Sequence, residues 1–430
     1  MKITVFQSHK GDCLLLEGSK GTTVLADGGM GISYSEHVAP SLGAMREQDR
    51  ALDLVYISHI DEDHIAGILK MMDDEVGWRV FERQKKIKNK KASKFKPDNP
   101  RPPEVRELWH NVFQDVVENN RGELEDLLIA SMKTTLLDQS LQDCFVELDN
   151  LINSERQALL LKHRLSAKQL GIPVNKPSKK KLMFIGKGGT VRKAIKRKEL
   201  EFTVIGPRRK ELDDLREQWN QWVEKNRKAI ERIREQAQIE ADRMNADEAL
   251  SFQSVLSHLA GELGDRSAVT PPNLASLMLV VADQGKTILL TGDSHPDDIE
   301  AGLEHAKLVD KNKRCHFDVI KVQHHGSEHN LGEKLFENVT ADHYVFCGNG
   351  LHGNPDPHFV ELLIRKRLAA PGTTNGFKLW FNSSDKLAPE GEPRKHMGKI
   401  ERLVRKQAKS SQGKLEFFFL KKGSSFDVAV

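Results

Sequence analysis

The chain has 430 residues, with 66 Lys or Arg against 62 Asp or Glu, so its formal net charge at pH 7 is +4 and does not by itself indicate a polyanionic partner. A chain of this length can bury a large core in one elaborated domain or in two. No stretch reaches the roughly 20 apolar residues of a membrane span, and the first residues lack the apolar core of a signal peptide, so we expect a cytoplasmic protein without a membrane partner.

Short apolar runs separated by glycine-containing turns open the chain. They predict strands at residues 2–6, 12–17 and 22–26, followed by a buried strand at 52–58. A helix is expected soon afterwards, from Ile65 to Met72, because apolar residues continue there at helical spacing.

The most informative stretch lies between that buried strand and that helix. It is the run His59-Ile60-Asp61-Glu62-Asp63-His64, in which five of six side chains can bind a metal. Because the run follows the end of a strand, we expect its side chains at the edge of a sheet. Imidazole and carboxylate together suit divalent ions such as Zn²⁺ or Mn²⁺. The alternative is a solvated acidic turn, which does not account for the metal-binding residues that follow later in the chain.

The middle of the chain is basic and mostly helical in pattern. Residues 83–96 carry eight Lys or Arg and no acid, and residues 176–198 carry ten and no acid. We predict that residues 73–199 form an insertion between two halves of one core, residues 1–72 and 200–430.

The second half of the core combines one long helix with a return to strand patterns. An amphipathic helix is expected at about 208–250, where it would pack on its own domain, on a second copy of the chain or on another protein. The remaining expected elements are strands at 201–205, 277–281, 287–290, 318–322 and 343–347, and a helix at 359–367.

Two of these strands end in further metal-binding residues. Thr291-Gly292-Asp293 follows one, and Gln323-His324-His325-Gly326-Ser327 follows another. The two oxygens of Asp293 can bridge two cations, while paired histidines offer one ligand and one group that transfers protons or orients a ligand. Since each cluster ends a strand, all of them can meet at one edge of the fold.

These motifs resemble the metallo-β-lactamase superfamily, and within it the competence-type, ComEC-like branch. The superfamily's ligand run is HxHxDH, and Asp61 stands where the second His usually stands, as it does in that branch. Further similar segments lie outside the metal site, at residues 7–12, 26–29, 273–277, 348–350 and 354–355. The resemblance covers about 1–72 and 200–368.

The resemblance implies a fold and a ligand set. The fold is α/β: an αββα sandwich of two mixed sheets, here with a long, mostly helical basic insertion. The ligands of the first metal are then His59 and Asp61, those of the second are Asp63 and His64, and the bridging and last ligands are Asp293 and His324, with His325 as the alternative to His324. Many relatives have another His where this chain has Ile205-Gly206-Pro207, so the number of ions, one or two, stays open.

The expected activity is hydrolysis by a metal-activated water, most plausibly as a phosphodiesterase or nuclease. Asp63, His325 and His329 are the candidate catalytic residues, the histidines as proton donors to the leaving group. Two alternatives stay open. One is hydrolysis of a small phosphodiester or ester, and the other is an effector or binding module of a multi-protein, defence-type bacterial system.

Substrate binding has its own candidates. The two basic runs are either solvated surface or contacts to a phosphate backbone. His110 has a competing structural role at a helix start, and the loop near residue 350 either lines a pocket or forms a turn. The candidates are His110, Ser327, Asn349, Asn354, Lys85, Lys86 and Lys90.

Overall fold

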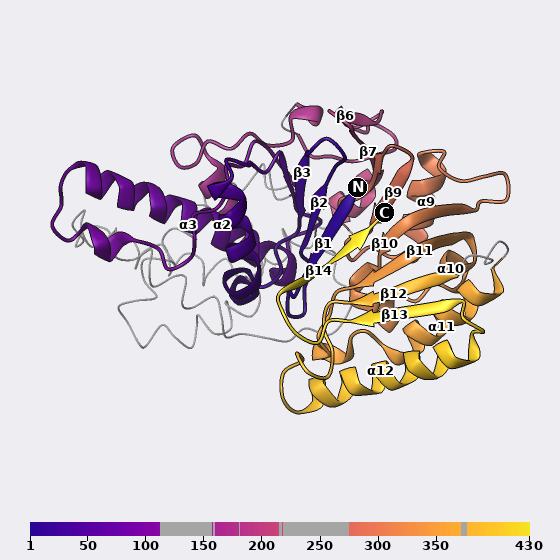
Figure 1. Cartoon of the computed structure of the whole chain (residues 1–430). Coiled ribbons are helices and arrows are strands. Elements are labelled where there is room, and N and C mark those ends of the chain that lie inside the picture. The colour runs from indigo at the N-terminus through magenta and orange to yellow at the C-terminus, as the bar shows by residue number, and fades with distance from the viewer. Residues whose placement is uncertain (112–156, 158–159, 180, 215–216, 218–274, 371–375) are drawn as a thin grey trace.

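The computed structural model describes residues 1–111, 157, 160–179, 181–214, 217, 275–370 and 376–430 (Figure 1). Most of the predicted helix at 208–250, and the helical pattern at 112–156, lie outside the described residues. In the described part of the chain, none of the helices combines the length and apolar character needed to cross a membrane.

The described strands form two mixed sheets. Within the first sheet, β1 pairs antiparallel with both β14 and β2, whereas β3, β4 and β5 run parallel to one another. In order across the sheet, its strands are β14 (Ser425–Ala429), β1 (Lys2–Phe6), β2 (Leu14–Glu17), β3 (Thr23–Ala26), β4 (Leu54–Tyr56) and β5 (Leu108–Trp109).

The second sheet comes almost entirely from the second half of the chain. Its strands β9 to β13 are parallel, and β6 to β9 are antiparallel. In order across the sheet, they are β13 (Leu415–Phe419), β12 (Phe377–Phe381), β11 (Val339–Phe346), β10 (Cys315–Lys321), β9 (Lys286–Leu290), β8 (Met278–Asp283), β7 (Leu200–Gly206) and β6 (Ile195–Arg197).

Both faces of each sheet are buried. Ile3 and Val5 of β1 belong to the same core cluster as Leu279 of β8 and Val319 of β10, so the two sheets pack face to face. The alternating side chains point outward, as Leu25 does between Val24 and Ala26, and pack under helices. This explains why the strand sequences are almost continuously apolar, because side chains on both faces of each sheet are shielded from solvent.

Helices cover the two outer faces and complete an αββα sandwich, in agreement with the mixed α/β fold expected from the sequence (Figure 1). On the first sheet and its neighbouring loops lie α1 (Gly31–Ser33), η1 (Tyr34–Val38), α2 (Ala39–Glu47), α3 (Glu62–Lys86), η2 (Ala92–Phe95) and η4 (Lys176–Ser178). On the second sheet and its loops lie α9 (Pro296–His305), η5 (Gln323–Gly326), η6 (Glu328–Asn330), α10 (Glu333–Asn338), η7 (Leu351–Gly353), α11 (Pro357–Ala369) and α12 (Glu392–Ser410).

The helix predicted at 65–72 is longer than expected. It continues as α3 to Lys86, past the boundary drawn at residue 72. Beyond residue 72 the sequence no longer has apolar residues at regular helical spacing, and ion pairs one turn apart stabilise the helix instead. Examples are Lys70 with Asp74 at 2.8 Å and Glu75 with Arg79 at 2.9 Å. The described part of 73–199 also contributes β5 and β6 to the two sheets, so it is not a separate helical body.

Candidate metal centre

Strand ends at one edge of the sandwich bring the metal-binding side chains together. His59 follows β4, Asp63 and His64 open α3, Asp293 follows β9, and His325 lies in η5 directly after β10. In the first sheet β4 runs parallel to β3, and in the second sheet β9 and β10 are parallel. The carboxyl ends of β4, β9 and β10 therefore place these residues at the same edge of the sandwich.

Asp293 lies at the middle of the group. Its Oδ1 is 3.5 Å from Nε2 of His64, and its Oδ2 is 3.4 Å from Nε2 of His325 and 3.9 Å from Nε2 of His59. Its carboxylate therefore faces three imidazoles at once. Asp12, His64, Asp293 and His325 are all buried, with one ligand atom from each lying within 4.8 Å of the others.

The histidines share one orientation, in which Nε2 faces the centre and Nδ1 is held from behind. Such partners fix the ring and its tautomer in metal sites. The Nδ1 partners are Ser58 Oγ at 3.0 Å for His59, Asp27 Oδ2 at 3.0 Å for His64, Asn330 Oδ1 at 2.6 Å for His324 and Asp12 Oδ1 at 3.2 Å for His325.

The atoms that face the centre have no hydrogen-bond partner among the described residues. They are Nε2 of His59, His64 and His325, and Oδ1 of Asp293, all buried. Leaving several buried polar atoms unpaired costs several kcal/mol, so a native protein rarely does it without a ligand. Imidazole nitrogens and carboxylate oxygens fit a divalent transition-metal ion.

Asp61 and Asp63 lie on the open side of this group. Oδ2 of Asp63 is 3.2 Å from Nε2 of His325, and Oδ2 of Asp61 is 3.8 Å from Nε2 of His59. Their side chains are 27% and 18% exposed, whereas that of His59 is 1% exposed. Solvent and substrate would therefore reach the centre past these two carboxylates.

The two histidines of η5 differ in position. His325 is buried among Asp12, Asp63 and Asp293, whereas His324 is half-buried with its Nε2 3.9 Å from Oδ2 of Asp293. The sequence names His324 as the ligand with His325 as the alternative, and gives proton transfer to His325. The geometry favours the reverse assignment, which we adopt as the proposal below.

Three further charged residues belong to the centre and were given no role from the sequence. Asp12 lies in the β1–β2 turn, Asp27 follows β3, and Lys321 ends β10. The buried Nζ of Lys321 contacts the carboxylate of Asp12, donates to O of Gly292 at 3.2 Å and lies 3.5 Å from Oδ1 of Asp293. The turns Gly11-Asp12 and Asp27-Gly28 were the available indication for the aspartates; a strand lysine gives none.

Burial and mutual charge set the protonation of the centre. Burial, with the neighbouring His64, lowers the pKa of His59 to about 3. Burial also opposes charge on His64 and His325, but Asp293 and the other nearby carboxylates outweigh it and raise the pKa of both well above 6.5. The same histidines hold the pKa of Asp293 well below its ordinary value despite burial. Without a metal, protons on His64 and His325 therefore offset part of the charge of the carboxylates.

Gly206 ends β7 and packs against Met278. A Cβ at this position would lie 2.1 Å from Cε of Met278, the far end of a flexible side chain, so a side chain here would require Met278 to move.

The remaining candidates lie around the centre or away from it. His110 is buried at the end of β5, and burial lowers its pKa to about 3. Ser327 and Asn349 are buried in loops after β10 and β11, Asn354 precedes a cis proline, and His329 is exposed in η6. Lys85 and Lys86 lie at the distant end of α3, about 33 Å from Asp63 at 1.5 Å per residue, so the structure does not bring them to the centre, and Lys90 lies in the turn after this helix.

The geometry can be compared with known families. Residues 9–122 match the family model of the metallo-beta-lactamase superfamily. The match contains the run from His59 to His64, together with Asp12 and Asp27, while Asp293 and His325 lie beyond it. No curated protein matches the chain. The family match and the buried Asp/His group together support a metal-dependent hydrolase of this superfamily fold.

Proposed function

We propose that this protein is a metal-dependent phosphodiesterase that cleaves nucleic acid. The observation that carries the proposal is the pairing of a buried anionic centre, suited to divalent cations, with a strongly cationic helix beside it. The centre accounts for hydrolysis and the helix for the choice of a polyanionic substrate.

At the centre, we assign the ligand role to His59, His64, His325 and Asp293, with Asp61 and Asp63 at the open side. A divalent ion held there supplies Lewis acidity toward a phosphate and lowers the pKa of water. Asp27 and Asp12 fix the rings of His64 and His325 from behind. His324 faces the open side with its Nδ1 tied to Oδ1 of Asn330, so the protonated ring would present its Nε2–H to the leaving oxygen.

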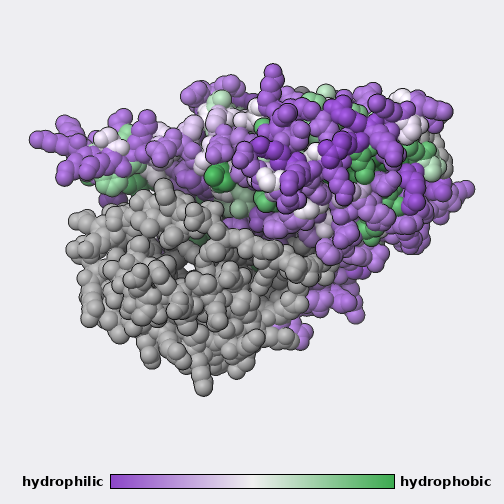
Figure 2. Space-filling model, turned by 90° about the horizontal axis from the view of Figure 1, so that it is seen from below, coloured by the Kyte–Doolittle hydropathy of each residue, from purple (hydrophilic) through white to green (hydrophobic). Residues whose placement is uncertain are grey.

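Helix α12 supplies the cationic surface. It carries seven Lys or Arg against two Glu, and only a narrow apolar stripe, including Met397, Ile400 and Val404, faces the sheet. Figure 2 shows the side of the molecule on which α12 lies at the bottom of Figure 1, and hydrophilic side chains dominate its coloured part. A helix of this kind can contact several phosphates without reading bases.

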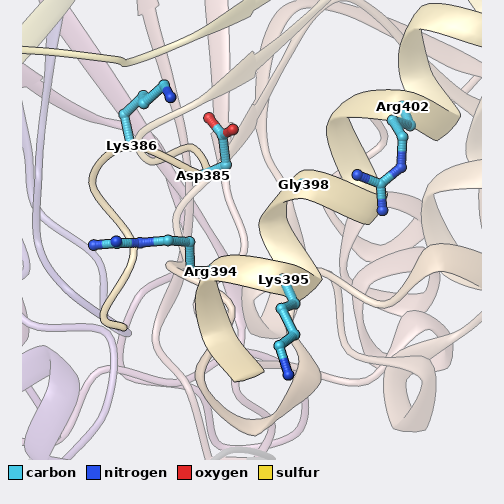
Figure 3. A pocket seen from close by; sticks show the side chains of 6 residues that line it. All are labelled: Asp385, Lys386, Arg394, Lys395, Gly398 and Arg402. Carbon is cyan, nitrogen blue, oxygen red and sulfur yellow. The ribbon is translucent and has the colours of Figure 1, made fainter. Parts of the chain in front are cut away.

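A groove of about 490 Å³ lies at the start of this helix. In Figure 3, Arg394 and Lys395 extend from the first turns of the helix, Lys386 and Asp385 lie on the loop beside them, and Gly398 lies between Arg394 and Arg402 along the helix. The lining residues are Asp385, Lys386, Arg394, Lys395, Gly398 and Arg402. Four cations against one acid favour a phosphate-bearing ligand.

The groove is joined to the metal centre through the loop that follows β11. Nε2 of His396 in α12 lies 2.8 Å from O of Pro355. At the other end of this loop, a Cβ at Gly348 would lie 3.6 Å from Cβ of His325. A strand of nucleic acid lying along α12 would therefore pass close to the ligands.

The first test removes the centre. Changing Asp63 and His64 to Ala should abolish hydrolysis of a generic phosphodiester such as bis(p-nitrophenyl) phosphate, with the circular dichroism spectrum unchanged. Retained turnover in the folded variant would reject the metal centre as the catalytic site.

The second test separates nucleic acid from small substrates. Changing Arg394, Arg402 and Lys406 to Glu should weaken DNA or RNA binding and flatten its salt dependence, since each lost phosphate contact lowers the log–log slope by about 0.9. Hydrolysis of the small phosphodiester should stay at the wild-type rate. The matched control, with Lys85, Lys86 and Lys90 changed to Glu, makes the same charge change at the distant end of α3. A greater loss in that control would move the interface to the basic run, and equal nucleic-acid binding in all three proteins would favour a small phosphodiester.

A further inference from the structure

A second group of metal-binding side chains lies outside the centre described above. His9, Glu36 and His37 each offer one ligand atom, and these three atoms lie within 4.8 Å of one another. Among the described residues, none of the three forms an ion pair with Asp293 or with the histidines around it, so the group is a separate feature. It includes two imidazoles and a carboxylate, the ligand set of several zinc sites.

His9 is presented by the turn between β1 and β2. Its φ is 59°, a left-handed conformation that few residues other than glycine adopt. The turn is closed by the Gly11 N–H, which donates to O of Ser8 at 3.2 Å. The same turn carries Asp12, the partner of His325, three residues further on.

Glu36 and His37 are presented by η1, a single π-helical stretch between α1 and α2. Its ends are fixed in the core, because Tyr34 and Val38 are fully buried. The wider turn sets Glu36 and His37 beside His9, whose ring centroid lies 6.4 Å from that of His37. Such stretches are rare and occur frequently at functional sites.

The ring of His37 is oriented as a metal ligand would be. Its Nδ1 lies 3.2 Å from Oγ of Ser424 in the turn between β13 and β14. If Nδ1 donates to that hydroxyl, the lone pair of Nε2 accepts from the Gln7 amide and lies on the side of Glu36, whose Oε2 is 3.6 Å away, so a bound ion would replace Gln7 at this nitrogen. This arrangement matches the way the main centre holds its histidines, with one nitrogen fixed and the other directed at the site.

We propose that His9, Glu36 and His37 bind a second kind of divalent ion, of zinc type, separately from the hydrolytic centre. Glu36 is exposed and the histidines are half-buried, so the fourth position is open to water.

This site lies next to the loop that carries Asp12, the partner of His325. An ion bound there ties the turn of residues 7–12 to η1. Since that turn ends in Asp12, the ion stabilises the loop that orients His325 without contacting substrate. The proposal does not depend on the hydrolytic function, because the three ligands are independent of the main centre.

The test counts metal in the full chain. After equilibrium dialysis against Zn²⁺ at pH 7.5, the His9→Ala/His37→Ala variant should hold one equivalent less than the wild type by elemental mass spectrometry. The matched control His305→Ala/His316→Ala removes two exposed histidines elsewhere and should hold as much as the wild type. Equal zinc content in wild type and the His9/His37 variant, both folded by circular dichroism, would overturn the proposal.

Two further variants distinguish this site from the main centre. Glu36 is exposed, so Glu36→Gln should fold normally and bind the separate equivalent at least about tenfold more weakly. In Asp63→Ala/His64→Ala the separate equivalent should persist even if the main centre is empty. Its loss there, with Glu36→Gln binding as tightly as the wild type, would assign all the metal to the main centre.

Discussion

Asp12 and Lys321 form a fully buried ion pair that joins the two sheets at the metal centre. Asp12 comes from the β1–β2 turn of the first sheet, and Lys321 ends β10 of the second. Lys321 also lies 3.5 Å from Oδ1 of Asp293, so its ammonium serves two carboxylates whose charge the histidines alone do not balance.

Removing that ammonium should destabilise the protein. In Lys321→Met the buried carboxylates lose a permanent counter-charge, and breaking such a pair costs about 3–5 kcal/mol. Urea unfolding in the presence of a chelator measures the loss, and added divalent metal should restore part of it. The control Lys286→Met removes an exposed partner of Asp318 on the adjacent strand and should change little. Equal unfolding midpoints for the two variants would contradict the role given to Lys321.

Asp27 should matter for metal affinity although it faces away from the ion. Its Oδ2 holds Nδ1 of His64 at 3.0 Å, and its Oδ1 accepts from the Ser58 N–H at 2.7 Å. Asp27→Asn keeps the shape but removes the charge that stabilises the ring in its ligand orientation, so affinity should fall about 10–100-fold. Competition with a chromogenic chelator measures the metal dissociation constant of the variant and of the wild type. An unchanged dissociation constant would show that Asp27 is only structural.

The two histidines of η5 can be separated by their effects on binding and on rate. His325→Ala removes a buried ligand and should lose metal, whereas His324→Ala should retain metal and lose turnover. Metal content and kcat measured on the same preparations distinguish the two. If His324→Ala loses the metal and His325→Ala keeps it, His324 is the ligand and the assignment proposed here is wrong.

Metal binding should depend on pH in a direction set by His64 and His325. Without metal, their raised pKa values contribute stability that is fully present below 6.5 and is lost as pH rises through the raised values. The lowered pKa values of Asp63 and Asp293 contribute stability above 3.8 that is lost as pH falls through the lowered values. Metal displaces the histidine protons, so the difference in melting temperature between loaded and chelator-treated protein should grow from pH 5.5 to 8.5. A constant difference would contradict this.

Much of the sandwich could be predicted from the sequence because its strands are short apolar runs bounded by glycine turns. The clusters at 59–64, 293 and 324–325 each end such a strand, and in the structure they lie together. Their binding of metal stays a prediction. Helix α12 was missed because its stripe of Met397, Ile400 and Val404 is too narrow to stand out among charges.

The sequence did not predict the residues that orient the metal-binding side chains or balance their charge. Asp12 and Asp27 were seen only as turn residues, since their histidine partners are 313 and 37 positions away (325 − 12 and 64 − 27). Lys321 was taken for an ordinary strand residue. Only the packing of one sheet on the other shows that the ammonium group of Lys321 reaches the carboxylate of Asp12.

The pairing of β1 with β14 has a consequence for how the protein is made. Thr4 and Asp427, 423 positions apart, hydrogen-bond at 2.6 Å across this pair of strands. Because β14 follows β1 so far along the chain, β1 keeps one unpaired edge during synthesis until Ser425–Ala429 have left the ribosome. Unpaired edges invite association with other chains. We expect translation that is slowed or interrupted near Ser425–Ala429 to favour aggregation, because β1 then keeps its unpaired edge for longer. Earlier interruptions, which leave β1 without β14, should favour aggregation even more.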